Sequence, residues 1–391
     1  MARFKPSEMA SMIRELKTIA GSAAYTNLKS FIEGTITSYD DKAEVTRIRD
    51  YAFKDCRSLI SVSFPKCSFI GFEAFQQCVA LTDVSFPECS YIVASAFEAC
   101  YSLTNASFPE CSYISGYAFR SCTRLPNASF PECSYIGHYA FKDCRSLISV
   151  SFPKCSAISD GAFMNCTSLK SIAFPECSFI GYSAFYSCYS LTNASFPECL
   201  SIGNSAFQQC SALTDVSFPK CSFIGHNAFT NCSSLLSVSF PECSFIGNYA
   251  FLKCSSLLSV SFPECTHITT CAFISCTSLL SVSFPECLSI GNSAFRECYS
   301  LTNMSFPKCS YISNNAFQSC YCLRSIYFMA SSVAKLGNSN AFISTPIAGY
   351  TSYTDGAYGS IYVPASLYSA YLSASGWSFY ADRIVSIDGG S

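Results

Sequence analysis

The amino-acid sequence predicts a solenoid, a fold in which short repeats form successive coils that stack on one another. Two observations support this prediction. An Ala-Phe pair recurs every 22 residues, from Phe53 to Phe317, in thirteen copies without a break in register. Each Phe is followed by a Cys three residues later and by a Leu six residues later. A fixed period of this length is typical of stacked repeats, because a single unit cannot bury its apolar face alone.

The middle of each unit predicts a β-strand. It reads L-x-x-V-x-F-P-x-C, and in the first copy these letters are Leu59, Val62, Phe64, Pro65 and Cys67. This spacing matches the pattern of leucine-rich repeats. The Val and the Phe are two residues apart, so both face one side of a strand, while Ser61 and Ser63 face the other. Successive strands should pair in parallel, and the proline should end each strand because it lacks an N–H group.

The segment I-G-x-x-A-F-x-x-C should return the chain to the next strand. The spacing of Ala74, Phe75 and Cys78 predicts a short helical or 3-10 turn that packs inward. The expected fold is therefore an α/β-type leucine-rich-repeat solenoid, with a parallel sheet on one face, such turns on the other and a cap at each end. Stacking should place like residues over one another as structural ladders. Their expected members are Cys67, Cys89, Cys111, Cys133, Phe53, Phe75 and Phe97.

Three regions follow from the extent of the repeat. Residues 1–33 predict a helical cap, with Met9, Met12, Ile13 and Leu16 on one face. Residues 34–330 form the solenoid of thirteen 22-residue repeats. Residues 331–391 predict a C-terminal cap that covers the open end, with strands at 361–363 and 383–387 and a helix between them.

The 27 cysteines follow the repeat. Twenty-five of them occupy two repeat positions, and only Cys271 and Cys322 lie elsewhere. Disulfides or a metal site are one interpretation. Burial as small apolar side chains is the favoured one, because a uniform column offers no preferred disulfide pairing and paired C-x₂₋₄-C zinc motifs are missing. A thiol at the position of Cys67 can also donate a hydrogen bond to a backbone carbonyl at the bend. Reduced thiols are consistent with folding in a cytoplasm.

Composition and the motifs present argue against several classes of function. The net charge is −2 without a basic patch, which argues against nucleic acid as a partner. The sequence has neither an apolar run long enough for membrane insertion nor the apolar core of a secretory signal at its start. His138 and His226 share a repeat position but are four coils apart, roughly 19 Å at a usual strand spacing. Without a catalytic fingerprint we expect no enzyme activity, no cofactor and no metal.

The repeat unit IGxxAFxxCxSLxSVSFPEC resembles the BspA-like leucine-rich repeat family of bacterial surface proteins over residues 48–330. The final segment, from TPIAG to RIVSI, is similar to the tails of repeat proteins encoded by gut Firmicutes and their phages. This resemblance implies binding or adhesion rather than catalysis. It also implies a place at a cell surface or in a phage particle, and the missing signal favours a phage-particle or cytoplasmic product.

Variation between units marks candidate binding residues, because outward positions vary while inward positions barely do. The candidates are Tyr101, Tyr117, His138, Tyr139, Tyr182, Tyr189, Tyr249 and Tyr299. Tyr, Ser, Asn and His over a rigid frame resemble an antibody paratope. The alternative is that these rings, and the aromatic residues before each Ile, only pack along the neighbouring coil. We expect a protein or glycan on a host or neighbouring cell as the ligand, with a passive spacer as the alternative and oligomerisation through the N-terminal helix as an option.

Overall fold

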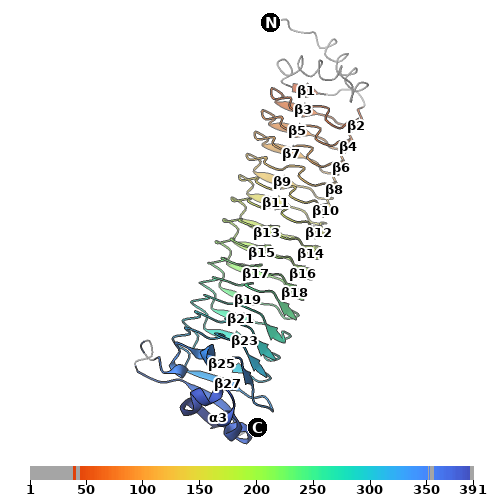
Figure 1. Ribbon diagram of the computed structural model, residues 1–391. Coiled ribbons are helices and arrows are strands. Elements are labelled where there is room, and N and C mark those ends of the chain that lie inside the picture. Colours follow the sequence, from red (N-terminus) through yellow and green to blue (C-terminus); the bar gives the residue numbers. More distant parts are fainter. Residues whose placement is uncertain (1–37, 41–44, 351, 353–355, 388–391) are drawn as a thin grey trace. The chain divides into compact units, whose positions relative to one another are not determined.

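The computed structural model describes residues 38–40, 45–350, 352 and 356–387. The helical cap expected at 1–33 therefore lies outside the described residues. The chain divides into two compact units, Met1–Glu176 and Cys177–Ser391. Within each unit, coils of 22 residues stack through parallel strand pairing, so the predicted solenoid is confirmed (Figure 1).

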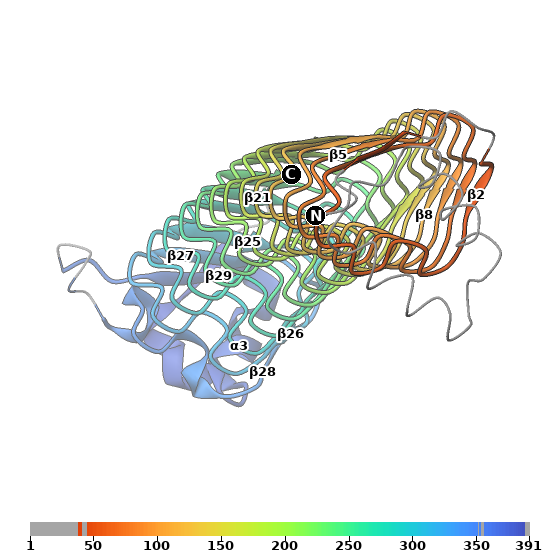
Figure 2. The same cartoon turned by 90° about the horizontal axis from the view of Figure 1, so that it is seen from above.

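Each coil of the first unit contributes two short strands, and equivalent strands pair in parallel from coil to coil. The longer, odd-numbered strands are β1 (Ser38–Asp40), β3 (Ser61–Ser63), β5 (Asp83–Ser85), β7 (Asn105–Ser107), β9 (Asn127–Ser129), β11 (Ser149–Ser151) and β13 (Ser171–Ala173). The even-numbered strands are β2 (Arg47–Ile48), β4 (Phe69–Ile70), β6 (Tyr91–Ile92), β8 (Tyr113–Ile114), β10 (Tyr135–Ile136) and β12 (Ala157–Ile158). Figure 2 shows that successive coils follow the same path.

The second unit repeats this arrangement and ends in a cap. Its longer strands are β15 (Asn193–Ser195), β17 (Asp215–Ser217), β19 (Ser237–Ser239), β21 (Ser259–Ser261), β23 (Ser281–Ser283), β25 (Asn303–Phe306), β27 (Ser325–Phe328), β29 (Ser360–Pro364) and β30 (Ile384–Ile387). Its two-residue strands are β14 (Phe179–Ile180), β16 (Ser201–Ile202), β18 (Phe223–Ile224), β20 (Phe245–Ile246), β22 (His267–Ile268), β24 (Ser289–Ile290), β26 (Tyr311–Ile312) and β28 (Lys335–Leu336). The short helices are η1 (Ser339–Phe342), η2 (Pro346–Ala348), η3 (Ala365–Leu367), α3 (Tyr368–Ser373) and η4 (Trp377–Arg383).

The register of the longer strands matches the sequence pattern. In β3, Val62 is 3% exposed, while Ser61 and Ser63 on either side are half-buried. Val62 pairs with Val84 of β5, and Ser61 pairs with Asp83. The alternation of inward Val and outward Ser is therefore confirmed, and each coil places its residues over those at the equivalent repeat positions of its neighbour.

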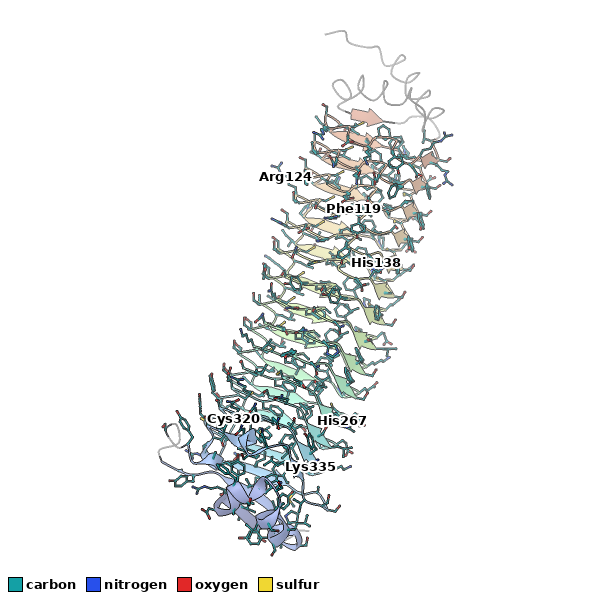
Figure 3. All side chains as sticks on the ribbon, viewed as in Figure 1. Phe119, Arg124, His138, His267, Cys320 and Lys335 are labelled. Atoms are coloured by element: carbon teal, nitrogen blue, oxygen red, sulfur yellow. The ribbon has the colours of Figure 1, made fainter. Side chains whose placement is uncertain are left out.

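Two columns of phenylalanine fill the interior. Phe53, Phe75 and Phe97 stack with nearly parallel rings, at centroid distances of 5.0 and 5.1 Å. A second column, which contains Phe64 and Phe86, packs edge-on against the first. Figure 3 labels Phe119, the next member of the first column, which is fully buried. Ring-on-ring contact between coils thus supplies the burial that one repeat lacks.

The Ala-Phe segment differs from the expected helical or 3-10 turn. The N–H groups of Ala74, Gln76 and Cys78 close turns within their own coil, whereas those of Phe75 and Gln77 donate to the next coil. This alternation requires left-handed backbone at Glu73 (φ 51°) and Gln77 (φ 59°), and every coil repeats it at both positions. The reason is that a 3-10 helix would use its N–H groups internally and leave the neighbouring coil without these bonds. We call this segment the rim.

The C-terminal cap covers the ends of both phenylalanine columns. Trp377 packs edge-on against Phe328 at 5.6 Å and lies 6.2 Å from the ring of Phe342. Its indole N–H donates to the Ala334 carbonyl at 2.6 Å, and the Ala334 N–H donates to the Tyr371 hydroxyl at 3.0 Å. Large aromatic side chains, whose polar atoms are hydrogen-bonded, therefore cover the last coil where a further coil would otherwise stack.

Candidate functional site

The two cysteine columns hold buried thiols with structural hydrogen bonds. Cys67 and Cys89 donate to the carbonyls of Phe69 and Tyr91, at 3.2 and 3.5 Å. In the other column, Cys78 donates to the Phe53 carbonyl of the preceding coil at 3.0 Å. Burial raises the pKa of Cys89 to about 12, so this thiol is neutral and unreactive near pH 7. A small apolar side chain with a weak donor suits both positions, so burial and these hydrogen bonds account for the two columns.

The aromatic residues before each Ile form an outer stack in the first unit. The ring centroids of Tyr91 and Tyr113 are 4.7 Å apart, and those of Tyr113 and Tyr135 are 4.9 Å apart. Phe69 continues the stack, and the Arg47 guanidinium lies 4.0 Å from its ring centroid. The faces of Tyr113 are therefore covered on both sides by rings. Packing along the neighbouring coil accounts for this column, and its interior members offer a ligand only edges and hydroxyl groups.

A different set of tyrosines occupies the left-handed rim position two residues before the Phe. These are Tyr51, Tyr117, Tyr139 and Tyr249, with φ values of 62°, 60°, 54° and 59°. Bulky residues rarely adopt this backbone region, and each such residue costs roughly 1–3 kcal/mol. The same position accepts Gly161 and Asn227 in other coils, which adopt it more easily. Stability alone therefore does not explain tyrosine at this position.

The structure brings three of the predicted residues together in adjacent coils of the first unit. The rings of Tyr117 and Tyr139 stack at 5.4 Å, and the Tyr117 N–H donates to the His138 carbonyl at 2.8 Å. The His138 side chain is 58% exposed and its Nδ1 lies 3.8 Å from an Asp160 carboxylate oxygen. We call Tyr117, His138 and Tyr139 the rim patch. Figure 3 labels His138 in this unit.

Cationic side chains border the rim patch. The Arg120 guanidinium lies 5.6 Å from the Tyr117 ring centroid, and the Lys142 ammonium lies 5.3 Å from that of Tyr139. Each cation is within cation–π distance of its ring and adds positive charge beside it, which would attract a carboxylate or carbonyl group. The far face of Tyr139 lies against the backbone of Gly161, where an added Cβ would come within 2.3 Å of Cε1 of the ring. Because Gly161 has no side chain, the Tyr139 ring can lie directly against its backbone.

The other predicted residues do not join this patch. Tyr101 is 47% exposed in the first unit. In the second unit, Tyr182 is 52% exposed, and the Tyr189 hydroxyl donates to Gln209 at 3.2 Å. Tyr299 stacks on Tyr321 at 5.0 Å.

Tyr249 lies in the second unit beside Cys271, one of the two cysteines outside the repeat columns. A hydrogen bond between the two side chains contributes to the raised pKa of Tyr249, after the electrostatic effect of the same thiol. Burial raises the pKa of Cys271 despite this contact. The pair is therefore neutral at pH 7, and we assign it no reaction.

The described residues contain no group of three or more His, Cys, Asp or Glu side chains arranged to hold a metal ion. In the same part of the chain, none of the helices has the length and apolar character needed to cross a bilayer.

Stacked coils with two parallel strands each and an apolar interior define a leucine-rich-repeat solenoid. A family model described as "BspA type Leucine rich repeat region (6 copies)" matches residues 26–148, 134–257 and 222–348. These matches cover most of the chain, so the protein belongs to the BspA-type leucine-rich repeat family. No curated protein sequence matches the chain.

Two solved structures illustrate the likeness. A leucine-rich repeat protein from Bacteroides ovatus is 24% identical, with a TM-score of 0.69 over 90% of this chain and 92% of its own. A leucine rich cell surface protein from Faecalibacterium prausnitzii is 22% identical, with a TM-score of 0.45 over 92% of both chains. At these identities the first likeness supports the fold and does not assign a ligand.

Proposed function

We propose that this protein is a non-catalytic binding protein that recognises a protein or glycan on a host or neighbouring cell through its rim. The observation that carries the proposal is the recurrence of exposed tyrosine at a left-handed backbone position. The fold requires left-handed backbone at this position in every coil, and tyrosine there, in place of the more tolerant Gly or Asn, presents an aromatic ring to solvent at a cost in strain. Tyr51, Tyr117 and Tyr249 are 43%, 36% and 39% exposed, whereas Tyr139 is half-buried.

The composition of the rim patch supports recognition by contact. Tyrosine provides a large, rigid ring with a polar tip. Because it has few rotatable bonds, little conformational entropy is lost when a ligand orders its side chain. His138 adds an exposed imidazole beside the carboxylate of Asp160, and Arg120 and Lys142 add positive charge. Aromatic and cationic side chains of this kind dominate the energetics of protein interfaces. This favours a protein ligand at the rim patch.

The test uses a substitution that removes the rings without straining the fold. Asparagine tolerates the left-handed region better than tyrosine, so Tyr117→Asn with Tyr139→Asn should keep or raise the thermal midpoint. Binding of the full chain to intact bacterial and animal cells, and to protein and glycan arrays, is measured for both forms. We expect the double variant to lose binding by about tenfold or more, since interface tyrosines often contribute at least 1.4 kcal/mol.

A matched control is Ser205→Asn, which introduces the same residue at the same rim position in the second unit without removing a ring. Its binding should equal that of the wild type. If the double variant binds cells and arrays as tightly as the wild type does, the rim patch is no binding site and a passive spacer is the better description.

A further inference from the structure

A cavity of about 290 Å³ opens in the C-terminal cap of the second unit. Three segments line it: η1 with the residues after it, η2 with the residues after it, and η4. The lining includes the side chains of Ser339, Asn340, Ile343, Ser344, Tyr350 and Phe379. The volume is near the lower end of the range for small-ligand pockets, about 300–1,000 Å³, and suits one sugar ring better than a larger ligand.

Fixed backbone and aromatic contacts build the walls. Ser344 (φ 60°) lies two residues after Phe342 and repeats the second left-handed position of the rim, that of Gln77, and Gly349 (φ 91°) turns the chain beside it. The Tyr380 hydroxyl donates to the Ser339 carbonyl, which ties η4 to η1. Phe379 packs edge-on against Tyr380 at 5.1 Å, yet is 70% exposed. A large aromatic ring exposed at the mouth of a formed cavity is a typical feature of ligand sites.

A row of aromatic rings from the solenoid ends at this cavity. The rings of Tyr299 and Tyr321 stack at 5.0 Å, and Tyr321 lies 5.3 Å from Tyr350, which lines the cavity. Tyr299 and Tyr350 are each 37% exposed. A ligand longer than one ring could therefore extend from the cavity along neighbouring coils. Tyr299, one of the candidates predicted from variation between units, is thus the far member of the row that leads to the cavity.

The chemistry of the lining selects among ligand classes. Among the residues that the structure describes, the lining includes no Asp, Glu, Lys, Arg or His, so these residues offer neither an anion nor a cation a charged partner. They combine aromatic faces with the exposed Asn340 carboxamide and the hydroxyls of Ser339 and Ser344. Aromatic faces attract the partly positive C–H groups of a sugar ring, and amide and hydroxyl groups pair with its hydroxyls. An apolar peptide side chain would leave these polar groups unpaired at some cost.

We propose that this cavity is a binding site for a neutral monosaccharide unit of a glycan, with Phe379 stacking on the sugar and Asn340 bonding its hydroxyls. The site lies apart from the rim patch in the sequence and does not depend on it. Tyr350 forms the side from which the glycan continues toward Tyr321 and Tyr299. One sugar in so small a cavity should bind with a dissociation constant on the order of 1 mM.

The test is saturation-transfer NMR on the full chain with free sugars. The probes are N-acetylglucosamine, galactose, mannose and fucose as neutral sugars, glucuronic acid and sialic acid as charged ones, and a Leu/Phe-rich peptide. We expect transfer to at least one neutral sugar. Phe379→Ala, which removes an aromatic contact, and Asn340→Ala, which removes a hydrogen-bonding group, should each weaken its binding about tenfold.

Controls separate binding from folding. Both side chains are exposed, so neither variant should shift the thermal midpoint, which is measured in parallel. Phe179→Ala removes a ring that is 45% exposed elsewhere in the second unit and should leave sugar binding unchanged. The proposal is overturned by absent transfer to every neutral sugar, by preferential binding of a charged sugar or the peptide, or by wild-type affinity in both cavity variants.

Discussion

Raising the pH should unfold this protein already in mildly alkaline solution, because each coil contains two buried thiols. Burial raises the pKa of Cys89 to about 12 and that of Cys133 to about 11, whereas an unfolded cysteine has a pKa of about 8.5. The folded state therefore binds the thiol proton more tightly than the unfolded state does. The thiol contribution to stability is complete below pH 8.5 and is lost as the pH rises toward 11 or 12.

The magnitude follows from the linkage relation. At pH 10 a thiol whose pKa rises from about 8.5 to 11 or 12 on folding loses about 2 kcal/mol of its contribution to the free energy of unfolding. Desolvation also raises the pKa of Cys100 and Cys122 in the other column, so a coil with both thiols loses about 4 kcal/mol. Domains are stable by about 5–15 kcal/mol in total. Three or four coils therefore suffice to exceed that stability at pH 10.

The assay follows far-ultraviolet circular dichroism and thiolate absorbance together, from pH 7 to 11, under reducing conditions. Both signals should change in one steep transition below pH 10.5, because the thiols ionise only when their coils open. Replacing Cys89 with Ala should lower the slope of the unfolding free energy by about 1.4 kcal/mol per pH unit. Gradual thiolate formation centred near pH 8.5, with an unchanged dichroism spectrum, would refute the burial argument.

Three further outcomes are expected. At pH 7.5 a thiol reagent should modify Cys322 quickly and the remaining cysteines only on denaturation, because it alone is not buried; mass spectrometry of the peptides checks the site. Phe119→Ala should cost about 3–5 kcal/mol in urea unfolding, since the ring is fully buried between neighbours at 5.3 and 5.2 Å. Gly161→Ala should lower the thermal midpoint, at a cost of about 1–3 kcal/mol, because the residue has φ 60° and its Cβ would strike the Tyr139 ring; an unchanged midpoint would contradict that packing.

Sequence periodicity was sufficient for the interior of each coil. Val62 and Phe64 recur with the spacing of one strand face, and both are buried as expected. The second strand of each coil, such as Phe69–Ile70, was not predicted because two residues cannot display an alternation. The cap strands at 360–364 and 384–387 agree closely with those predicted, since their Ile and Val residues alternate over a longer run.

The backbone conformation of the rim could not be predicted from the sequence in the same way. The spacing of Ala74, Phe75 and Cys78 fits a helical turn as well as it fits alternating turns, so the spacing did not discriminate between them. Left-handed backbone is usually signalled by Gly or Asn, yet Glu73 and Gln77 carry no such signal. The proximity of Tyr117 and Tyr139 did follow from the 22-residue period. The cap cavity did not, because its walls come from residues beyond the last regular repeat.

The difference between interior and rim has a physical basis that bears on function. Each interior side chain touches its copies above and below, so a change at Phe119 disturbs contacts with both Phe97 and Phe141. At the rim, the bond between coils runs from one backbone to the next, as from Tyr117 to His138. The stacking of the coils therefore does not depend on which side chain stands there. One rim position can thus hold Tyr, Ser, Asn, Gly, Glu or Cys in successive coils, so a binding surface can vary on this frame while the solenoid that supports it stays constant.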